Sequence, residues 1–247
     1  MKIFQPNSVI YFLAHTILVI LGFFLSRSPD PLFNNFGVSL LAAGITGYIV
    51  FVYIYFTQKM TKKIDILTEY GLEEIFEARG ARIKKEYDQR LHRAKKNIDI
   101  LGFGLSTLRG DYLGEFERWK RNADVRILLI DPEFPSMDFS YADQRDREEN
   151  NNIGTINSEV RKFIAEAKPF LDANFSIRLY RCIPAVNIFR VDNELFWGPY
   201  LISKQSRNNP TFVSKEGGKL FSIYCDHFEK IWGDEVFSRN VPSDWLQ

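Results

Sequence analysis

The stretch IPAVNIFRVDNELFWGPY, residues 183–200, decides how the second half of this chain folds. It holds two short runs, NIFRV and ELFWGPY, that are rich in β-branched and aromatic residues and therefore favour strands. Asp192 and Asn193 lie between the runs, and both residue types favour tight turns between antiparallel strands. The stretch predicts a β-hairpin.

On both sides of this hairpin, strand patterns alternate with helix patterns. Upstream, the β-rich runs NIDILGFGL and VRILLIDP flank residues 110–124, whose aromatic residues suit a crossover helix. Residues 131–152 are rich in turn formers and predict a long surface loop. A helix near residues 156–171, the strand FSIRLYR and a closing amphipathic helix complete the pattern. Together these segments predict one α/β domain over residues 97–247.

Residues 57–96, which lead into this domain, have apolar residues at helical spacing and predict a helical linker. The second part of the linker is strongly basic, and only Glu86 and Asp88 oppose its cations. Such a face is typical of a solvated helix, of attraction to anionic lipid headgroups, or of binding to a nucleic-acid or nucleotide partner. The candidate partner-binding residues are Arg79, Arg82, Lys84, Lys85, Arg90, Arg93, Lys95 and Lys96.

Two apolar runs without Asp, Glu, Lys or Arg occupy residues 8–25 and 36–56. About 20 apolar residues cross the hydrocarbon core of a bilayer as a helix. A secretory signal peptide is the alternative for the first run, but only Lys2 precedes it and no small-residue cleavage site follows it. Residues 1–56 therefore predict a transmembrane hairpin, which makes residues 57–96 a juxtamembrane linker.

The charges beside the two runs predict the orientation of the hairpin. Lys59, Lys62 and Lys63 follow the second run directly, whereas the short connector offers only Arg27, offset by Asp30. Positive residues collect on the cytoplasmic side of membrane helices. We therefore expect a protein of the bacterial inner membrane with two spans, whose termini and α/β domain are cytoplasmic.

Small and polar residues inside the spans suggest specific packing. Ser39, Ala43 and Gly47 recur every four residues and predict a stripe for close helix approach, within the hairpin or between copies of the chain. His15 lies near the middle of the first span, where an ionisable group is by default a functional candidate. The alternative for His15 is a neutral imidazole that is hydrogen-bonded to Ser39 or to a backbone carbonyl.

Composition and motifs exclude several function classes. The net charge of +1 indicates no polyanionic partner for the chain as a whole. Cys182 and Cys225 fit a reducing compartment and suggest neither a disulfide framework nor a thiolate metal site. No phosphate-binding loop, dinucleotide fingerprint or spaced metal-ligand cluster occurs, so we expect no cofactor and no metal.

The order KNIDILGFG, NADVRILLIDP, FSIRLYR and NIFRVDNELFWGPY resembles one repeat of the phospholipase D superfamily over roughly residues 85–235. That resemblance implies a phospholipase D-like α/β sandwich. The active motif of the family is His-x-Lys, four residues and an Asp, followed by a Gly-Ser turn. In it the His is the nucleophile, and the Lys and Asp hold phosphate and orient the site.

The catalytic residues of that motif are missing here. With the motif Asp placed at Asp192, the His position falls on Ala185 and the Lys position on Asn187, while Gly198 arrives one residue early and precedes Pro199. Alanine has no nucleophile and asparagine has no positive charge. The domain is therefore expected to be a degenerate, non-catalytic relative of this fold, and we expect no hydrolysis of the phospholipase D type.

A two-helix hairpin joined to a small cytoplasmic α/β module resembles, in layout, the two-transmembrane effectors of bacterial anti-phage systems, of the retron type or gated by cyclic nucleotides. That resemblance implies an abortive-infection effector whose hairpins assemble into homo-oligomers and disrupt the inner membrane. Its trigger would be a cytoplasmic partner, such as a reverse transcriptase with its RNA and DNA.

Three other function classes stay open. The first is a membrane-tethered sensor that binds a nucleotide or another phosphate ligand in a remnant pocket near Asn187, Arg190 and Asp192. The second is an enzyme with an unrecognised site, which activity of the isolated soluble part on lipid or nucleic acid would reveal. The third is a membrane scaffold without an output of its own.

Overall fold

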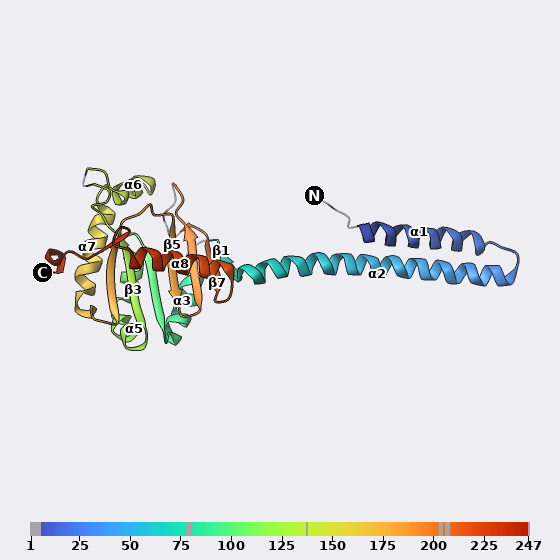
Figure 1. The fold of residues 1–247 in the computed structure, drawn as a ribbon, viewed down its shortest axis with the longest axis horizontal. Coiled ribbons are helices and arrows are strands. Elements are labelled where there is room, and N and C mark those ends of the chain that lie inside the picture. The colour runs from blue at the N-terminus through green and yellow to red at the C-terminus, as the bar shows by residue number, and fades with distance from the viewer. Residues whose placement is uncertain (1–5, 78–80, 137, 203–204, 206–207, 247) are drawn as a thin grey trace. The chain divides into compact units, whose positions relative to one another are not determined.

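The computed structural model describes residues 6–77, 81–136, 138–202, 205 and 208–246 (Figure 1). The chain divides into two compact units, Met1–Ile66 and Leu67–Gln247. In the first unit, helix α1 covers Pro6–Leu25, and helix α2 begins at Pro31 and continues to Tyr70, beyond the end of the unit. The second helix is thus longer at both ends than the span expected over residues 36–56.

Helix α2 begins earlier than its apolar run because two local signals favour a helix start. The Asp30 carboxylate accepts a hydrogen bond of 2.8 Å from the backbone N–H of Leu32. Pro31 occupies the first helical position, where a missing N–H does no harm. The connector therefore shrinks to the residues between Leu25 and Pro31.

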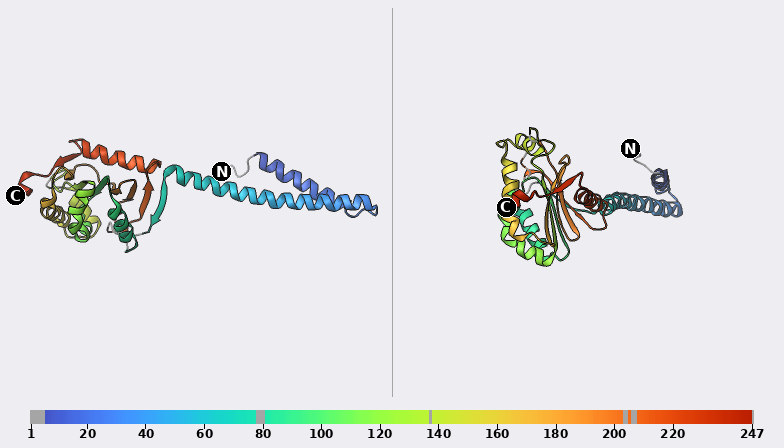
Figure 2. Two further views of the ribbon diagram at one scale, coloured as in Figure 1. Left: turned by 90° about the horizontal axis from the view of Figure 1, so that it is seen from below. Right: turned by 60° about the vertical axis from the view of Figure 1, so that its left-hand side comes forward.

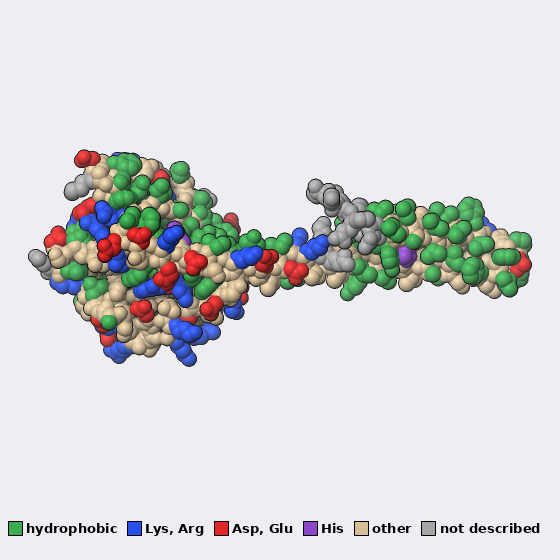
Figure 3. All heavy atoms as spheres, in the orientation of Figure 1, with side chains coloured by type: hydrophobic (Ala, Val, Ile, Leu, Met, Phe, Trp, Pro, Cys, Tyr) green, Lys and Arg blue, Asp and Glu red, His purple; other side chains and the backbone are tan. Residues whose placement is uncertain are grey.

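The hairpin carries mostly apolar side chains on its surface, whereas charged side chains of both signs cover the α/β domain (Figure 3). Within the described residues, α2 is the one helix long and apolar enough to cross a membrane, and α1 contributes the shorter apolar helix Val9–Leu25. Cores of soluble proteins and signal sequences contain similar helices, so the two spans and the inner-membrane location stay predictions.

Glycines let α1 and α2 approach closely, but not along the expected stripe. A Cβ atom on Gly44 would lie 2.6 Å from a methyl group of Val19, and one on Gly22 would lie 2.6 Å from the backbone nitrogen of Leu41. Ser39 and Ala43 are exposed instead, and of the expected stripe only Gly47 contacts α1. The i, i+4 spacing drifts around a helix of 3.6 residues per turn, so one helix face did not include all three.

The second unit is built on one sheet of eight strands in the order β1-β7-β6-β5-β2-β3-β4-β8. Strands β2, β3 and β4 are parallel, and every other neighbouring pair is antiparallel. The strands are β1 (Leu72–Phe76), β2 (Asn97–Gly102), β3 (Asp124–Ile130), β4 (Phe175–Tyr180), β5 (Val186–Val191), β6 (Glu194–Pro199), β7 (Thr211–Lys215) and β8 (Ser238–Asn240).

The expected hairpin is present as β5 and β6, with Val191 opposite Glu194 and the two residues Asp192 and Asn193 between them. Asp192 has a φ of 51°, the left-handed conformation that aspartate and asparagine tolerate better than most residues. The turn residues read from the sequence therefore correspond to the turn in the structure.

Helices cover both faces of the sheet (Figure 2). Helix α8 packs on one face, where the Tyr224 ring stacks at 4.3 Å on Trp197 of β6. On the other face, Tyr87 of α3 lies 4.5 Å from Phe189 of β5, and Phe116 of α5 lies 5.1 Å from Phe175 of β4. The helices of this unit are α3 (Ala81–Arg93), α4 (Ser106–Tyr112), α5 (Phe116–Asn122), α6 (Tyr141–Glu148), α7 (Thr155–Ala167) and α8 (Lys219–Gly233).

The structure corrects the expected linker over residues 57–96. Helix α2 extends to Tyr70, Gly71 turns the chain with a φ of 66°, and β1 then pairs with β7. Strand β1 and helix α3 thus belong to the α/β unit and do not precede it. The pentapeptide LEEIF is too short for its pattern to separate a strand from a helix, and only pairing with the distant β7 decides it.

A second correction concerns residues 131–152, expected to form a loop. Helix α6 occupies Tyr141–Glu148, and the Ser140 hydroxyl caps it by accepting a 3.0 Å hydrogen bond from the backbone N–H of Asp143. The fully buried Arg145 anchors this polar helix by donating to the carbonyl of Leu201 at 3.0 Å. Because the helix has few apolar residues, its amphipathic period is nearly absent from the sequence.

Candidate ligand-binding site

A cavity of about 600 Å³ opens at the carboxyl end of strand β2. Strand β5 begins beside this end, since Leu101 pairs with Ile188. Helices α3, α4 and α7 close the other sides. Ligands of open α/β sheets bind outside the carboxyl ends of the parallel strands, and volumes of this size are typical of small-molecule sites.

The wall of the cavity combines apolar, aromatic and neutral polar side chains. The apolar part comes from β2, β5 and the helices, and includes Ile83, Ile100, Leu108, Ile156 and Phe189. Hydroxyl and amide groups come from residues far apart in the sequence: Ser106, Thr107, Thr155, Asn151, Asn187 and Gln205. Tyr87, Phe103, Tyr112 and Tyr200 add aromatic rings.

Asn187 is the one residue of the expected remnant pocket that lines the cavity. It is 5% exposed, and its Nδ2 donates a 2.9 Å hydrogen bond to the carbonyl of Gly198 on β6. A Cβ atom on Gly198 would overlap the carbonyl oxygen of Pro210, so the backbone there approaches too closely for any side chain. The glycine thus fixes the strand beside Asn187.

The charged side chains that line the cavity are held in ion pairs. Lys84 Nζ donates to Asp111 Oδ1 at 2.8 Å, and this hydrogen bond raises the pKa of the lysine. The Glu159 carboxylate lies 2.8 Å from Arg109.

Glu149 lies 2.7 Å from the buried Arg145, whose guanidinium also stands 5.1 Å from the centre of the Tyr200 ring and 5.7 Å from that of Phe103. Each of the three carboxylates in the wall is therefore balanced by a neighbouring cation.

Arg190 lies on the opposite face of the sheet, under α8, and the structure does not bring it to Asn187. Its guanidinium stands 5.4 Å from the centre of the Phe221 ring and donates to Asp99 Oδ2 at 3.1 Å. Arg126 also donates to Asp99, at 2.7 Å, and pairs with Glu229 of α8. Burial raises the pKa of the Asp99 carboxyl. Side chains alternate across a strand, so residues 187 and 190 cannot share a face.

Asp192 lies at the far end of β5, away from the cavity. Its carboxylate accepts hydrogen bonds from the backbone N–H groups of Lys95, Lys96 and Asn97, the shortest at 2.8 Å. This residue fastens the β5–β6 turn to the start of β2. The expected trio of Asn187, Arg190 and Asp192 is therefore no pocket, although the turn role expected for Asp192 agrees with these contacts.

The basic stretch contains both internally paired and exposed cations. Arg90 pairs with Glu86 and with Glu194 of β6, at 3.0 Å for the latter, and lies 5.0 Å from the centre of the Phe196 ring. Arg90 and the cavity-lining Lys84 are thus used within the fold. Arg79 lies outside the described residues, and Arg82 belongs to α3 without a described side chain.

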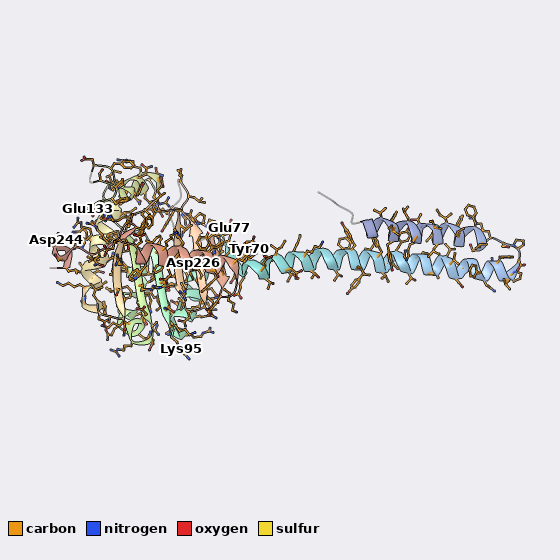
Figure 4. All side chains as sticks on the ribbon, in the orientation of Figure 1. Tyr70, Glu77, Lys95, Glu133, Asp226 and Asp244 are labelled. Carbon is orange, nitrogen blue, oxygen red and sulfur yellow. The ribbon has the colours of Figure 1, made fainter. Side chains whose placement is uncertain are left out.

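Lys85, Arg93, Lys95 and Lys96 are exposed. Figure 4 places Lys95 at the lower edge of the domain, where Figure 3 shows Lys and Arg side chains gathered.

In the hairpin, His15 contacts a backbone carbonyl, as in the second of the two interpretations of this residue. Its Nδ1 lies 2.8 Å from the carbonyl oxygen of Tyr11, and its ring stacks on the Tyr11 ring at 4.9 Å. A side chain on Gly47 would overlap the imidazole, so this glycine makes room for it. Thr16 and Tyr48 share a hydrogen bond between the two helices. Ser39 instead donates to the carbonyl of Asn35.

Sequence reasoning missed most of the cavity. Its walls come from β2, β5, three helices and the segment after β6, and no spacing in the sequence connects these parts. One signal was present: Gly102 and Gly104 in GFGLS, after a buried strand, allow backbone and neighbouring side chains to come close. Among the described residues, no group of three or more His, Cys, Asp or Glu side chains could hold a metal.

No protein-family model matches the chain, and no curated protein sequence does either. Among solved structures, the chain is similar to that of TrmBL2, an archaeal chromatin protein whose structure shows a novel mode of DNA binding. The sequences are 16% identical, the match covers 83% of this chain and 71% of the other, and the TM-score is 0.43. A likeness at that TM-score supports no inference about fold or function.

Proposed function

We propose that this chain is a membrane-anchored, non-catalytic sensor whose α/β domain binds a small molecule. The α1–α2 hairpin would hold it in the lipid bilayer, and the cavity at the end of β2 would receive the ligand. The observation that carries this proposal is the cavity itself, with its volume of about 600 Å³ and its neutral polar and aromatic wall.

The resemblance to the phospholipase D superfamily is kept as a proposal for the ancestry of this domain. It is supported by the place of Asn187, which lines the cavity at the position of the family's lysine. The cavity wall contains no histidine among the described residues, and Ala185 stands where the nucleophile is expected. A binding role explains a retained cavity without these residues.

Thermal unfolding of the full chain in lipid nanodiscs tests the sensor role. A panel of nucleosides, sugars and their phosphate esters is added one at a time. We expect at least one class to raise the Tm, because a ligand that binds only the folded state stabilises it. The variant Ser106→Trp places an indole in the cavity wall and should abolish that shift.

Ser158→Trp is the matched control, since Ser158 is exposed on α7 and does not line the cavity. A panel without any shift, or shifts that survive Ser106→Trp, would overturn the proposal.

A second proposal keeps the antiviral effector role: a partner such as a reverse transcriptase with its RNA and DNA would release the hairpins to assemble and disrupt the membrane. The observation in its favour is the exposed cation group Lys85, Arg93, Lys95 and Lys96, for which no ion pair is found among the described residues. Neutralising nucleic-acid phosphates requires such unpaired cations.

The effector role is tested by co-purification of a nucleoprotein with the double variant Lys95→Glu/Lys96→Glu. Arg90→Glu is unsuitable, because Arg90 is bound to Glu86 and Glu194 within the fold. The matched control is Lys162→Glu/Lys230→Glu, which makes the same charge change at exposed lysines of α7 and α8. Loss of nucleic acid in the first variant alone supports the assignment, and equal recovery from both contradicts it.

A further inference from the structure

We propose that the cavity selects an uncharged ligand with hydroxyl or amide groups and one flat or apolar face, and that it discriminates against phosphate esters. This inference rests on the proposed sensor role and names the chemistry of its ligand. Nucleosides and neutral sugars share that chemistry.

The charges of the wall argue against an anion. Among the described residues, four charged side chains line the cavity: Lys84, Asp111, Glu149 and Glu159. Three of them are carboxylates, and the single ammonium is already bound to Asp111 at 2.8 Å. A phosphate placed here would give up part of its hydration and find no unpaired cation among the described side chains of the wall, which is unfavourable.

The arginines behind the wall do not change this balance. Arg109 holds both Glu159, at 2.8 Å, and Glu166, at 2.7 Å, and is only 8% exposed. Arg145 is 2% exposed and is bound to Glu148 and Glu149. Turning either guanidinium toward a ligand would break these ion pairs and leave partly buried carboxylates unpaired, which is unfavourable.

The neutral groups of the wall match an uncharged polar ligand. Side-chain amides of Asn151 and Gln205 contain both donors and acceptors, and the hydroxyls of Ser106 and Thr107 provide one donor each. Aromatic rings and aliphatic side chains offer a surface for an apolar face. A nucleobase stacks on aromatic rings and bonds to amide side chains, and a sugar ring uses the same two kinds of contact.

The Lys84–Asp111 pair allows a test of this selectivity by a substitution that replaces a single oxygen atom by nitrogen. In Asp111→Asn, the ammonium of Lys84 loses its counter-charge at the cavity wall, while the size of the neighbouring side chain is preserved. We expect the variant to bind phosphate esters better and neutral ligands about equally. Since Lys84 is half exposed, the expected gain for a phosphate ester is about 5-fold.

Matched pairs provide the experiment: adenosine with AMP, and glucose with glucose 6-phosphate, each titrated calorimetrically into the full chain in nanodiscs. We expect the neutral member of one pair to bind at least about ten-fold more tightly than its phosphate ester. The pair that shows this effect distinguishes a nucleoside from a sugar. Asp111→Asn should narrow the difference, and Asp124→Asn, at the opposite end of the sheet, should not.

The outcomes separate the two proposals. If a phosphate ester binds more tightly than its neutral partner, and Ser106→Trp abolishes that binding, the selectivity inferred here is wrong while the sensor role stands. If neither member of either pair binds, and the full panel gives no thermal shift, the sensor role itself fails, and the selectivity with it.

Discussion

At the scale of single residues, the carboxylate of Asp192, which aligns with the Asp of the phospholipase D motif, serves a structural role. It satisfies the backbone N–H groups of three successive residues where the chain enters β2. Unpaired backbone donors are unfavourable in a folded protein, so a side chain that accepts from several of them organises the local backbone. The same residue also sits at a φ of 51°, where aspartate is tolerated.

Replacing Asp192 by Ala should lower the free energy of unfolding by about 2 kcal/mol, because the three N–H groups lose their acceptor. Asp192→Asn should retain most of the stability, since an amide oxygen still accepts and asparagine tolerates positive φ. Urea denaturation followed by tryptophan fluorescence reports on the α/β domain, which contains all four tryptophans of the chain. Asp124→Ala, at an exposed strand start, is the control, and an equal effect at both sites would refute the capping role.

At the scale of elements, the β5–β6 hairpin is held in place by a backbone contact at Gly198. The carbonyl of Pro210, just before β7, occupies the space in which a Cβ atom would lie, and the amide of Asn187 donates to the Gly198 carbonyl. The hairpin, β7 and the cavity wall thus meet at one glycine.

Gly198→Ala should therefore destabilise the domain by about 1–3 kcal/mol through overpacking. Gly110→Ala should have the opposite sign and stabilise by up to about 1 kcal/mol, because alanine favours helix and nothing lies within 4 Å of a Cβ atom there in α4. Thermal unfolding of both variants checks whether the two changes in stability have opposite signs. If Gly198→Ala leaves the stability unchanged, the segment at Pro210 moves away from the added Cβ atom at little cost, and the overpacking argument is wrong.

At the scale of the whole molecule, the hairpin surface decides whether the chain can act on a membrane. Gly22, Gly44 and Gly47 are used for packing between α1 and α2, whereas Ala43 remains exposed. A larger side chain at Ala43 therefore leaves the hairpin itself intact and alters only its contacts with other molecules. Gly44 offers the opposite case, since a Cβ atom there would overlap Val19.

If hairpins assemble to permeabilise the membrane, Ala43→Leu should relieve dye entry and depolarisation in bacteria that express the full chain. The reason is that a bulky side chain prevents close helix approach between copies. Gly44→Leu should lower the yield of folded protein in detergent, while Ala43→Leu should not. Unchanged dye entry with Ala43→Leu at equal expression would contradict assembly through this face.

The sequence by itself determined those features that depend on local chemistry. The tight turn at Asp192 and Asn193 follows from two residues that tolerate turn conformations, and the closing helix follows from apolar residues at helical spacing. The parallel pair of β2 and β3 follows from two buried runs joined by a helical segment. The apolar character of α1 and of the first part of α2 is likewise local.

Only the tertiary structure decided the features that depend on distant partners. Strand β1 exists because β7 pairs with it, and α6 is anchored because Arg145 reaches the carbonyl of Leu201. Arg190 faces α8 and therefore does not join Asn187 in a pocket. Arg90 is bound to Glu194 within the fold and is therefore not available to a partner. The cavity joins side chains more than 100 residues apart, from Lys84 to Asn187. Such encounters are set by sheet order and packing, and no local period of the sequence records them.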